Sequence, residues 1–376
     1  MKRISCVVLS LTLCVTLCGF ARAANTRAAA AILVDAESGR ILYGHNIHER
    51  RPIASITKLM TALVAVELTA DLDEEFTVAP ESVGIEGSSI YLQTNERVTM
   101  RGLLYGLLLQ SGNDAAAAVA CRVAGNEADF AEQMNRRARE LGMENSRFTN
   151  PSGLSDEDHY SSAYDMALLA RACLQNNTVA EICATRSITV GTRTFVNHNK
   201  LLSQYEGCIG MKTGYTELAG RTLVSAAQRS GQTLICVTLD DSDDWNDHEA
   251  LFDYGFARYP SRVLCSQGEV FGGVSVSGSL IPALPVAAAD TVRYPLREEE
   301  TLELTVEIAH GLQAPVAEGM SVGWASWSLN GKVVAETELI CAGEAPDDRY
   351  RHGSIWERIS RLWNRNEFAP KGAHLI

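Results

Sequence analysis

The sequence has little positive charge for its length. Its 376 residues include 33 lysines and arginines against 46 aspartates and glutamates, a formal net charge of −13. This deficit excludes a protein that binds nucleic acid by charge. The chain also lacks internal repeats and low-complexity tracts. With 46% hydrophobic residues it is ordinary globular material, long enough for two domains.

The cysteines lack the spacing of metal ligands or of a disulfide framework. Three of the ten, Cys6, Cys14 and Cys18, lie in an apolar N-terminal stretch. The other seven are odd in number, widely scattered and mostly in apolar surroundings. We therefore expect free, buried thiols in the mature protein.

The N-terminus lacks any charge from Ile4 to Phe20. Lys2 and Arg3 precede this run, and Ala21-Arg22-Ala23 follows it. A basic start, an apolar stretch and an A-x-A end are typical of a secretory signal peptide, which we place at residues 1–23. A membrane-spanning anchor is the alternative, but the run is at the short limit for a span. Cleavage would leave 30 basic against 46 acidic residues, or −16.

Residues 24–260 mix strand-like and helical patterns. Strand-like runs occur near Ala28 and again from about Lys212, and between them apolar residues recur at helical spacing. Helical stretches are expected at 100–124, 129–143 and 162–175. Strands at both ends with helices between them predict an α+β domain with an antiparallel sheet and a helical cluster.

Residues 261–346 show no helical periodicity. From Thr301 to Ile308 the apolar residues alternate strictly, which predicts a strand with one apolar face. Asn330-Gly331 between two strand-like runs is a strong hairpin signal. We expect a small β-rich, sandwich-like domain here.

The last segment, residues 347–376, reverses the charge balance. Between Arg349 and Ile376 there are six basic residues and two acidic ones. Five apolar residues would share one face of a helix: Ile355, Trp356, Ile359, Leu362 and Trp363. Such a helix can lie in the interface of an anionic membrane, and it is too short and too charged to span it. The alternative is a helix packed onto the β-rich domain.

Ser55 and Lys58 form the first chemically informative pair. Residues three apart share a face of a helix, so the hydroxyl and the amine can meet. A serine is a poor nucleophile unless a base takes its proton, and a lysine can do so only if burial or a second cation keeps it neutral. An S-x-x-K pattern alone is weak, because about one chance match is expected in a chain of this size.

Two further motifs follow in the chain. Ser111-Gly112-Asn113 lies between an apolar run and an alanine-rich helix, and Lys212-Thr213-Gly214 lies in a strand-like context. Lysine and threonine there could bind a carboxylate, and glycine allows a peptide backbone to approach an edge strand. Lys212 would also be the second cation beside Lys58.

The three motifs together, in this order, resemble those of penicillin-binding proteins and class A β-lactamases. The chain is similar to the low-molecular-mass penicillin-binding proteins, the D-alanyl-D-alanine carboxypeptidases of the S11 peptidase type. The stretches FTNPSGL (148–154), HYSSAYDMALLAR (159–171) and NHNKLL (197–202) carry the same resemblance. It covers essentially the whole mature chain.

The resemblance implies roles for individual residues. Ser55 is the acylated nucleophile, Lys58 its general base, and Ser111 relays a proton to the leaving amine. The substrate-binding residues that it implies are Asn113, Lys212, Thr213, Gly214 and Tyr215. It also implies an oxyanion hole formed by the backbone N–H groups of Ser55 and Tyr215. No metal or other cofactor is expected.

Some residues depart from the pattern or have simpler explanations. Gly112 stands where β-lactamases have aspartate, and no E-x-x-L-N motif occurs, so fast penicillin hydrolysis is not expected. His159 is expected to cap or pack. The acids at 156–158 and at 240–244 are expected to face water.

The sequence thus predicts an exported serine D,D-carboxypeptidase at the outer face of the cytoplasmic membrane. Its substrate would be the peptidoglycan stem pentapeptide, and β-lactams would acylate it covalently. The alternatives are a D,D-endopeptidase, a weak β-lactamase or a penicillin-binding sensor without turnover.

Overall fold

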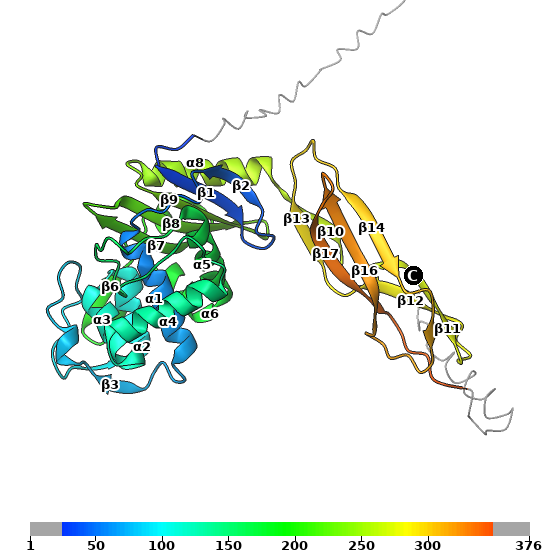
Figure 1. Cartoon of the computed structure of the whole chain (residues 1–376), viewed down its shortest axis with the longest axis horizontal. Helices are drawn as coiled ribbons and strands as arrows, with labels where there is room; N and C mark the ends of the chain where they lie inside the picture. Colours follow the sequence, from blue (N-terminus) through cyan, green and yellow to red (C-terminus); the bar gives the residue numbers. More distant parts are fainter. Residues whose placement is uncertain (1–24, 349–376) are drawn as a thin grey trace, which may run out of the picture. The chain divides into compact units, whose positions relative to one another are not determined.

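The computed structural model describes residues 25–348, and the chain divides into two units at Pro260 and Ser261 (Figure 1). The predicted signal peptide and nearly all of the predicted amphipathic tail lie outside the described residues. No helix among residues 25–348 is long and apolar enough to cross a membrane.

The first unit is built on a five-stranded antiparallel sheet of order β2-β1-β9-β8-β7. Its strands are β1 (Ala30–Asp35), β2 (Ile41–His45), β7 (Cys208–Thr216), β8 (Gly220–Arg229) and β9 (Gln232–Leu239). β1 pairs with β9 from Ala30↔Leu239 to Asp35↔Leu234, so the two ends of the unit meet in the sheet centre. The predicted α+β arrangement is therefore confirmed for this unit.

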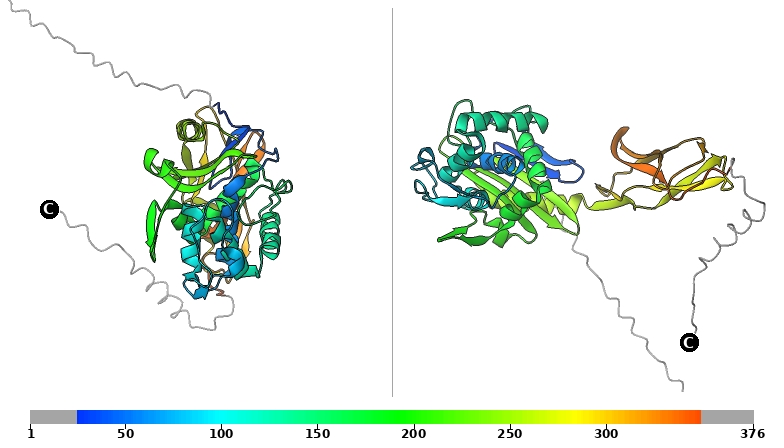
Figure 2. Two further views of the ribbon diagram at one scale, coloured as in Figure 1. Left: turned by 90° about the vertical axis from the view of Figure 1, so that its left-hand side faces the viewer. Right: turned by 90° about the horizontal axis from the view of Figure 1, so that it is seen from below.

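Helices cover both faces of this sheet (Figures 1 and 2). They are α1 (Lys58–Leu68), α2 (Met100–Leu109), α3 (Asn113–Ala124), α4 (Glu127–Glu140), α5 (Ala163–Gln175), α6 (Asn177–Ala184), α7 (Leu201–Gln204) and α8 (Asp244–Arg258). Two small antiparallel sheets, β3 (Glu75–Thr77) with β4 (Arg97–Thr99) and β5 (Ser187–Val190) with β6 (Arg193–Val196), complete the unit with the 3₁₀ turns η1 (Ala54–Thr57) and η2 (Pro80–Ser82).

Alternation along the strands divides the core into two layers. On β1, Ile32 and Val34 pack into the cluster that includes α1 and α5, whereas Leu33 packs on the opposite face with Leu251 and Phe252 of α8. Successive side chains of a strand point to opposite faces, so a sheet covered on both sides needs apolar residues at nearly every position.

The predicted helices are confirmed, with one break. The stretch 100–124 forms α2 and α3, separated by Ser111 and Gly112. Ser111 has a backbone φ of +61°, a left-handed conformation that no helix interior accepts. The second chemical motif therefore lies at a turn between two buried helices.

The second unit is entirely β-structure among its described residues. Its strands are β10 (Ser261–Cys265), β11 (Val270–Ser277), β12 (Ala283–Ala288), β13 (Val292–Pro295), β14 (Glu303–Ile308), β15 (Leu312–Gln313), β16 (Ser321–Leu329) and β17 (Lys332–Cys341). They form a two-stranded sheet, β10-β13, and a six-stranded sheet of order β14-β16-β17-β12-β11-β15. The β-rich character predicted from the sequence is confirmed.

Two local predictions in this unit have different outcomes. The hairpin is confirmed: Leu329 pairs with Lys332, and Asn330 and Gly331 have φ values of +52° and +77°. The strand predicted over the alternating residues is confirmed as β14, but its apolar face is largely exposed, with Leu304 49% and Val306 38% exposed. β14 is an edge strand, so its apolar side chains have neighbours on one side only.

The cysteine prediction is confirmed. All seven cysteines among the described residues are free thiols, five of them buried and two half-buried. Burial raises the pKa of the Cys183 thiol to about 12 and that of Cys208 to about 11. These thiols are packing residues and are not poised for reaction at neutral pH.

Candidate active site

The predicted nucleophile lies in a turn that leads directly into a helix. Ser55 belongs to η1, and Lys58 is the first residue of α1. Lys58 Nζ donates hydrogen bonds to Ser55 Oγ at 2.9 Å, to Asn113 Oδ1 at 2.8 Å and to the backbone oxygen of Ser152 at 2.5 Å. The structure thus joins residues from the first two motifs around one amine.

Lys58 is fully buried, and its surroundings disfavour its charge. Burial and the nearby cation of Lys212 lower the pKa of Lys58 well below its usual range, while the carboxylate of Asp114 opposes this in part. Desolvation and a like charge act in the same direction, because each penalises the ammonium form. A depressed pKa at a buried amine is typical of a general base.

The third motif lies on β7, the edge strand that faces η1. Lys212 is buried there, and burial lowers its pKa to about 7. Its Nζ donates to the backbone oxygen of Thr213 at 2.8 Å. Thr213 and Gly214 are half-buried, and Tyr215 is exposed. Among residues 25–348 β7 has a strand neighbour on one side only, which leaves its other edge open to pair with an extended peptide.

Gly214 lets β7 approach the turn that carries Ser55. A Cβ at this position would lie 2.9 Å from the backbone nitrogen of Ser55 and 2.4 Å from Thr222 Oγ1. Thr222 in turn donates to the backbone oxygen of Ile53, just before η1. Only glycine allows this approach without a shift of the backbone.

Asn113 is held from both ends of its side chain. Its Oδ1 accepts from Lys58, its Nδ2 donates to the backbone oxygen of Glu86 at 2.6 Å, and its backbone N–H donates to Ser88 at 2.7 Å. Ser111 is buried nearby in sequence, but no hydrogen bond within residues 25–348 joins its hydroxyl to Lys58 or Lys212. The structure therefore connects Asn113, but not Ser111, to the lysine.

Gly112 between them has little room for a side chain. A Cβ there would lie 2.9 Å from Asp114 Oδ1 and 3.0 Å from Ile90 Cγ2. Asp114 uses its carboxylate to accept the backbone N–H groups of Ile90 and Leu92 at 3.0 Å each. The departure from the β-lactamase pattern at this position is thus a packing requirement in this chain.

The turn before α1 has a support that sequence analysis did not predict. Ala54, directly before Ser55, has φ +49°, and its carbonyl accepts a hydrogen bond from Thr57 Oγ1 at 2.7 Å. His159 Nε2 lies 2.8 Å from the same hydroxyl, and His159 Nδ1 accepts the N–H of Thr149 at 3.2 Å. Because Nδ1 is an acceptor, the ring proton is on Nε2 and is donated to Thr57.

His159 is therefore more than the capping or packing residue that the sequence predicts. It does pack edge-on against Phe148, with ring centroids 5.7 Å apart. Burial is the main cause that lowers its pKa to about 4, which keeps the ring neutral above that pH. In the sequence, only the short spacing between the stretches 148–154 and 159–171 indicated that His159 contacts the first of these stretches.

The acidic segments are split between surface and interior. Asp156, Glu157 and Asp158 are exposed, as expected. The expectation that the acids after β9 face water is wrong for Asp241 and Asp244, which are 1% and 3% exposed. Asp244 is the first residue of α8 and pairs with the guanidinium of Arg221, and Asp241 lies in the turn just before this helix. No group of three or more His, Cys, Asp or Glu residues within 25–348 is arranged to hold a metal ion.

Comparison with known proteins supports the same interpretation. A family model described as D-alanyl-D-alanine carboxypeptidase matches residues 19–243, and one described as the C-terminal domain of penicillin-binding protein 5 matches residues 259–346. The chain is similar to D-alanyl-D-alanine carboxypeptidase DacC of Escherichia coli, with 32% identity over 362 residues, 90% of this chain and 88% of that protein.

Further similarities extend over both units. D-alanyl-D-alanine carboxypeptidase DacF of Bacillus subtilis is 29% identical over 343 residues, covering 87% of each chain. The crystal structure of penicillin binding protein 5 from Haemophilus influenzae matches with a TM-score of 0.73 at 28% identity, covering 86% of this chain and 98% of that one. The chain therefore belongs to the D-alanyl-D-alanine carboxypeptidases of the S11 peptidase family.

Proposed function

We propose that Ser55 is the nucleophile with which this enzyme removes the terminal D-alanine of peptidoglycan stem pentapeptides, through an acyl-enzyme. One observation carries the proposal: the Ser55 hydroxyl is 2.9 Å from a fully buried lysine amine whose pKa is strongly depressed. Family membership supplies the substrate class.

The contacts of Lys58 suggest how it acts as the base. Its ammonium form donates to three acceptors, Ser55, Asn113 and Ser152. A neutral amine has only two N–H groups, and Asn113 and Ser152 can keep both. The lone pair then points at Ser55 and can take the hydroxyl proton as Oγ attacks the substrate carbonyl.

The remaining steps follow from the other predicted residues. The new oxyanion would accept hydrogen bonds from the backbone N–H groups of Ser55 and Tyr215. Each bond would lower the activation barrier by about 3 kcal/mol. The resemblance to the family assigns the proton relay to Ser111: once substrate is bound, the proton would pass from Lys58 through this hydroxyl to the leaving nitrogen, the C–N bond breaks, and D-alanine departs. Water then attacks the ester carbonyl, the ester bond to Ser55 Oγ breaks, and the free hydroxyl is restored.

Substrate binding uses the edge of β7 and the amide of Asn113. The terminal carboxylate is placed against Lys212 and Thr213, and Gly214 leaves room for the peptide backbone. Lys212 Nζ keeps two N–H groups beyond its bond to Thr213. The carboxylate favours the charged lysine and raises its pKa from about 7 on binding. Asn113 Nδ2 has one N–H left for a substrate carbonyl.

The test is the pair of variants Ser55→Ala and Ser328→Ala, the second a serine of β16 in the second unit. We expect Ser55→Ala to lose both the penicillin adduct in intact-protein mass spectrometry and the release of D-alanine from a D-Ala-D-Ala peptide. Ser328→Ala should keep both. A penicilloyl adduct that forms on Ser55→Ala would contradict the assignment.

The same measurements separate the alternatives. Continuous, burst-free hydrolysis of penicillin would favour a β-lactamase, and a stable adduct without any D-alanine release would favour a sensor. Cleavage of cross-linked peptide dimers in preference to pentapeptides would favour an endopeptidase. We expect a long-lived adduct, because the chain has no E-x-x-L-N motif and Gly112 has no room for an aspartate.

We also propose a location for the enzyme. Residues 1–23 would be a cleaved signal peptide, 24–260 the peptidase domain, 261–346 a sandwich-like domain and 347–376 a tail that binds the outer face of the cytoplasmic membrane. What supports the tail is its charge: +4 beyond residue 348, against −16 for the mature chain, gains about 1 kcal/mol per basic residue at an anionic surface.

Truncation before Arg349 tests this location. The shortened protein should keep its activity on small peptides and no longer sediment with vesicles that contain phosphatidylglycerol. If the truncated protein unfolds, or if the full chain does not bind the vesicles, the tail packs on the protein and the membrane proposal fails.

A further inference from the structure

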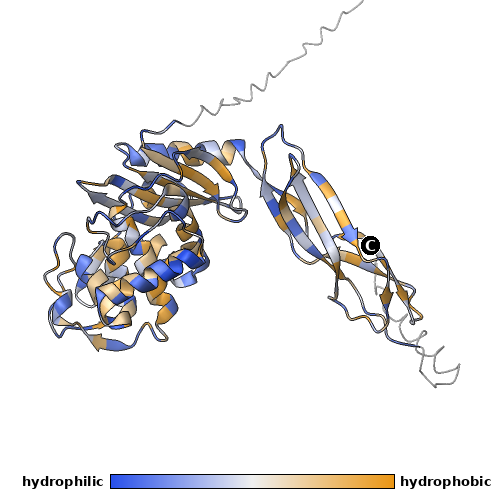
Figure 3. Cartoon of the chain, viewed as in Figure 1, coloured by the Kyte–Doolittle hydropathy of each residue, from blue (hydrophilic) through white to orange (hydrophobic). Residues whose placement is uncertain are grey.

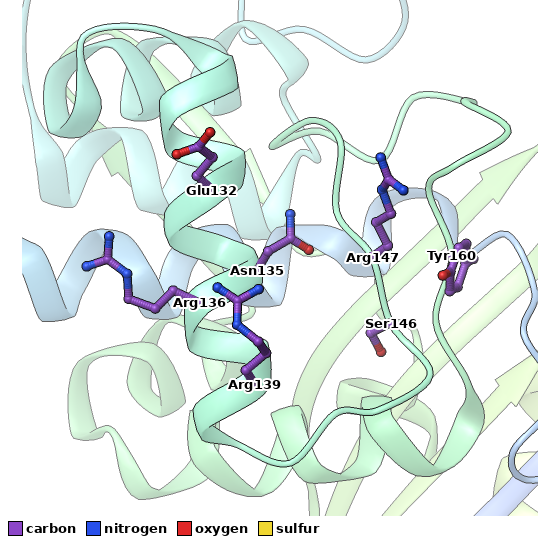
Figure 4. Close-up of a pocket in the computed structure, with 7 residues that line it drawn as sticks. All are labelled: Glu132, Asn135, Arg136, Arg139, Ser146, Arg147 and Tyr160. Carbon is purple, nitrogen blue, oxygen red and sulfur yellow. The ribbon is translucent and has the colours of Figure 1, made fainter.

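A pocket of about 480 Å³ lies between α4 and the segment 146–160 (Figure 4). Its volume is in the range of small-molecule sites. The residues that line it are Glu132, Asn135, Arg136, Arg139, Ser146, Arg147 and Tyr160. Three arginines and one glutamate give the pocket a positive balance in a protein of net charge −13.

The arginines of this pocket are poorly neutralised. Within residues 25–348, the side chains of Arg136 and Arg139 have no ion pair or hydrogen bond, and the side chain of Arg147 has only Asp158 at 3.5 Å, with both of these side chains more than half exposed. Arg137 on the same helix differs, since it pairs with Glu67 at 2.8 Å and with Glu140 at 3.1 Å. Glu67 of α1 and Glu140 of α4 thus neutralise Arg137, and the neighbouring arginines stay available for an anion.

Hydrogen bonds hold the residues on both sides of the pocket in place. Asn135 on α4 bonds both backbone groups of Phe148, the oxygen at 2.6 Å and the nitrogen at 2.9 Å. Arg147 and Tyr160 exchange two backbone hydrogen bonds, of 2.8 and 3.0 Å. In Figure 4, Arg139 on α4 and Arg147 on the opposite segment flank the space, with Tyr160 beside Arg147, whereas Arg136 extends along the far side of the helix.

A further cation and an aromatic ring adjoin this space. The guanidinium of Arg50 lies over the Tyr160 ring, 5.1 Å from its centroid. The α4 face seen in Figure 3 is largely hydrophilic, in contrast to the strands of the sheet. An aromatic face beside guanidinium groups is suited to a ligand with a flat or polyol body and a charged end.

We propose that this pocket binds a phosphate group carried by a small polyol or sugar. Guanidinium groups bind phosphate through paired, charge-assisted hydrogen bonds. The guanidinium groups that flank or adjoin the space are those of Arg139, Arg147 and Arg50, and against Glu132 they leave two positive charges, which matches a phosphate better than a single carboxylate. The volume exceeds that of phosphate alone, so a body of sugar or glycerol size would accompany it. The phosphate belongs either to a soluble molecule or to a phosphoglycerol lipid headgroup.

The pocket is distinct from the Ser55 site. Tyr160 lines it, while the preceding residue, His159, is buried and bonds Thr57 beside the nucleophile. Adjacent residues of this extended segment thus point to different sites. Neither Arg139 nor Arg147 contacts a predicted catalytic side chain, so hydrolysis of small peptides should not depend on them.

Calorimetric titration of the full chain with glycerol 3-phosphate and with inorganic phosphate tests the proposal. Arg139→Gln and Arg147→Gln should each weaken glycerol 3-phosphate binding by about tenfold or more, through loss of a charge-assisted hydrogen bond. Arg97→Gln on β4, a surface arginine paired with Glu75, is the charge-matched control and should bind normally. All variants should release D-alanine from small peptides at the wild-type rate.

Two further measurements distinguish a soluble phosphate from a lipid headgroup and from a carboxylate. If soluble phosphates do not bind, but Arg139→Gln weakens binding to phosphatidylglycerol vesicles and Arg97→Gln does not, the phosphate is that of a lipid headgroup. Malonate is the carboxylate competitor. Tighter binding of malonate than of glycerol 3-phosphate, equal binding by all variants, or no binding in either arm would overturn the proposal.

Discussion

The interiors of the two units hold different chemistry. The first unit buries two lysines, Lys58 and Lys212, two histidines, His159 and His248, and several aspartates. In residues 261–348 the buried polar or charged side chains reduce to Thr337. Both units have apolar cores, so apolar packing alone does not distinguish them.

The difference shows that the first unit accepts a loss of folding stability at the residues proposed for catalysis. A buried lysine costs free energy because its ammonium form is desolvated, and this cost lowers the pKa of Lys58, as the proposed role of a base requires. The second unit carries no such cost in its described part. We infer that the first unit is arranged for chemistry and the second for support, and four changes test this contrast.

The largest effect is expected from Lys58→Arg. Arginine keeps a positive charge but has no accessible neutral form, so it cannot take the proton of Ser55. The rate of acylation by penicillin should fall by roughly three orders of magnitude, measured by stopped-flow or by mass spectrometry over time. Acylation at a near-wild-type rate would mean that Lys58 is not the base.

A smaller effect is expected from Thr57→Val. The substitution leaves the Ala54 carbonyl without its hydroxyl donor and the His159 Nε2–H without its acceptor. We expect a loss of about 2 kcal/mol in the free energy of unfolding, because both groups stay buried. Acylation should also slow by about tenfold, since the turn before Ser55 is no longer held at its strained φ.

The conservative change Thr57→Ser is the control for this effect. It keeps the hydroxyl and should restore the acylation rate, although a lost methyl group still lowers stability. If Thr57→Val and Thr57→Ser acylate equally fast, the hydroxyl does not position the nucleophile.

A third change concerns pH. In the proposed mechanism Lys58 must be neutral and Lys212 charged, so kcat/KM should fall in acid as Lys58 gains a proton. It should fall in alkali as Lys212, whose pKa is about 7 in the free enzyme, loses its own. Lys212→Arg keeps the cation at high pH and should move the alkaline limb upward by more than one pH unit. An unchanged alkaline limb would show that another group titrates there.

The smallest effect is expected from Thr337→Val, the same substitution in the second unit. The Thr337 hydroxyl makes only long contacts, 3.4 Å to the N–H of Asp290 and 3.4 Å to the oxygen of Glu338. Such contacts are weak, so the free energy of unfolding should change by less than about 1 kcal/mol, and acylation should not change. A loss as large as that of Thr57→Val would remove the contrast between the units.

Much of the fold and of the site could be predicted from local patterns. The helices α4 and α5 and the Asn330-Gly331 hairpin follow from periodicity and turn chemistry, which depend on neighbours in the chain. The exposure of Leu304 and the burial of Asp241 were not predictable in this way. Both depend on tertiary packing, on the position of β14 in its sheet and on what surrounds the turn between β9 and α8.

The sequence by itself determined the contact of Ser55 with Lys58, because three residues of helix-like turn bring two side chains to one face. Tertiary structure decided what that contact can do. The pKa of Lys58 is lowered, as its proposed role as a base requires, only because segments far away in the chain, carrying Ser152 and Lys212, bury it and add a second cation. Desolvation and long-range charge arise from packing, and no local pattern encodes them.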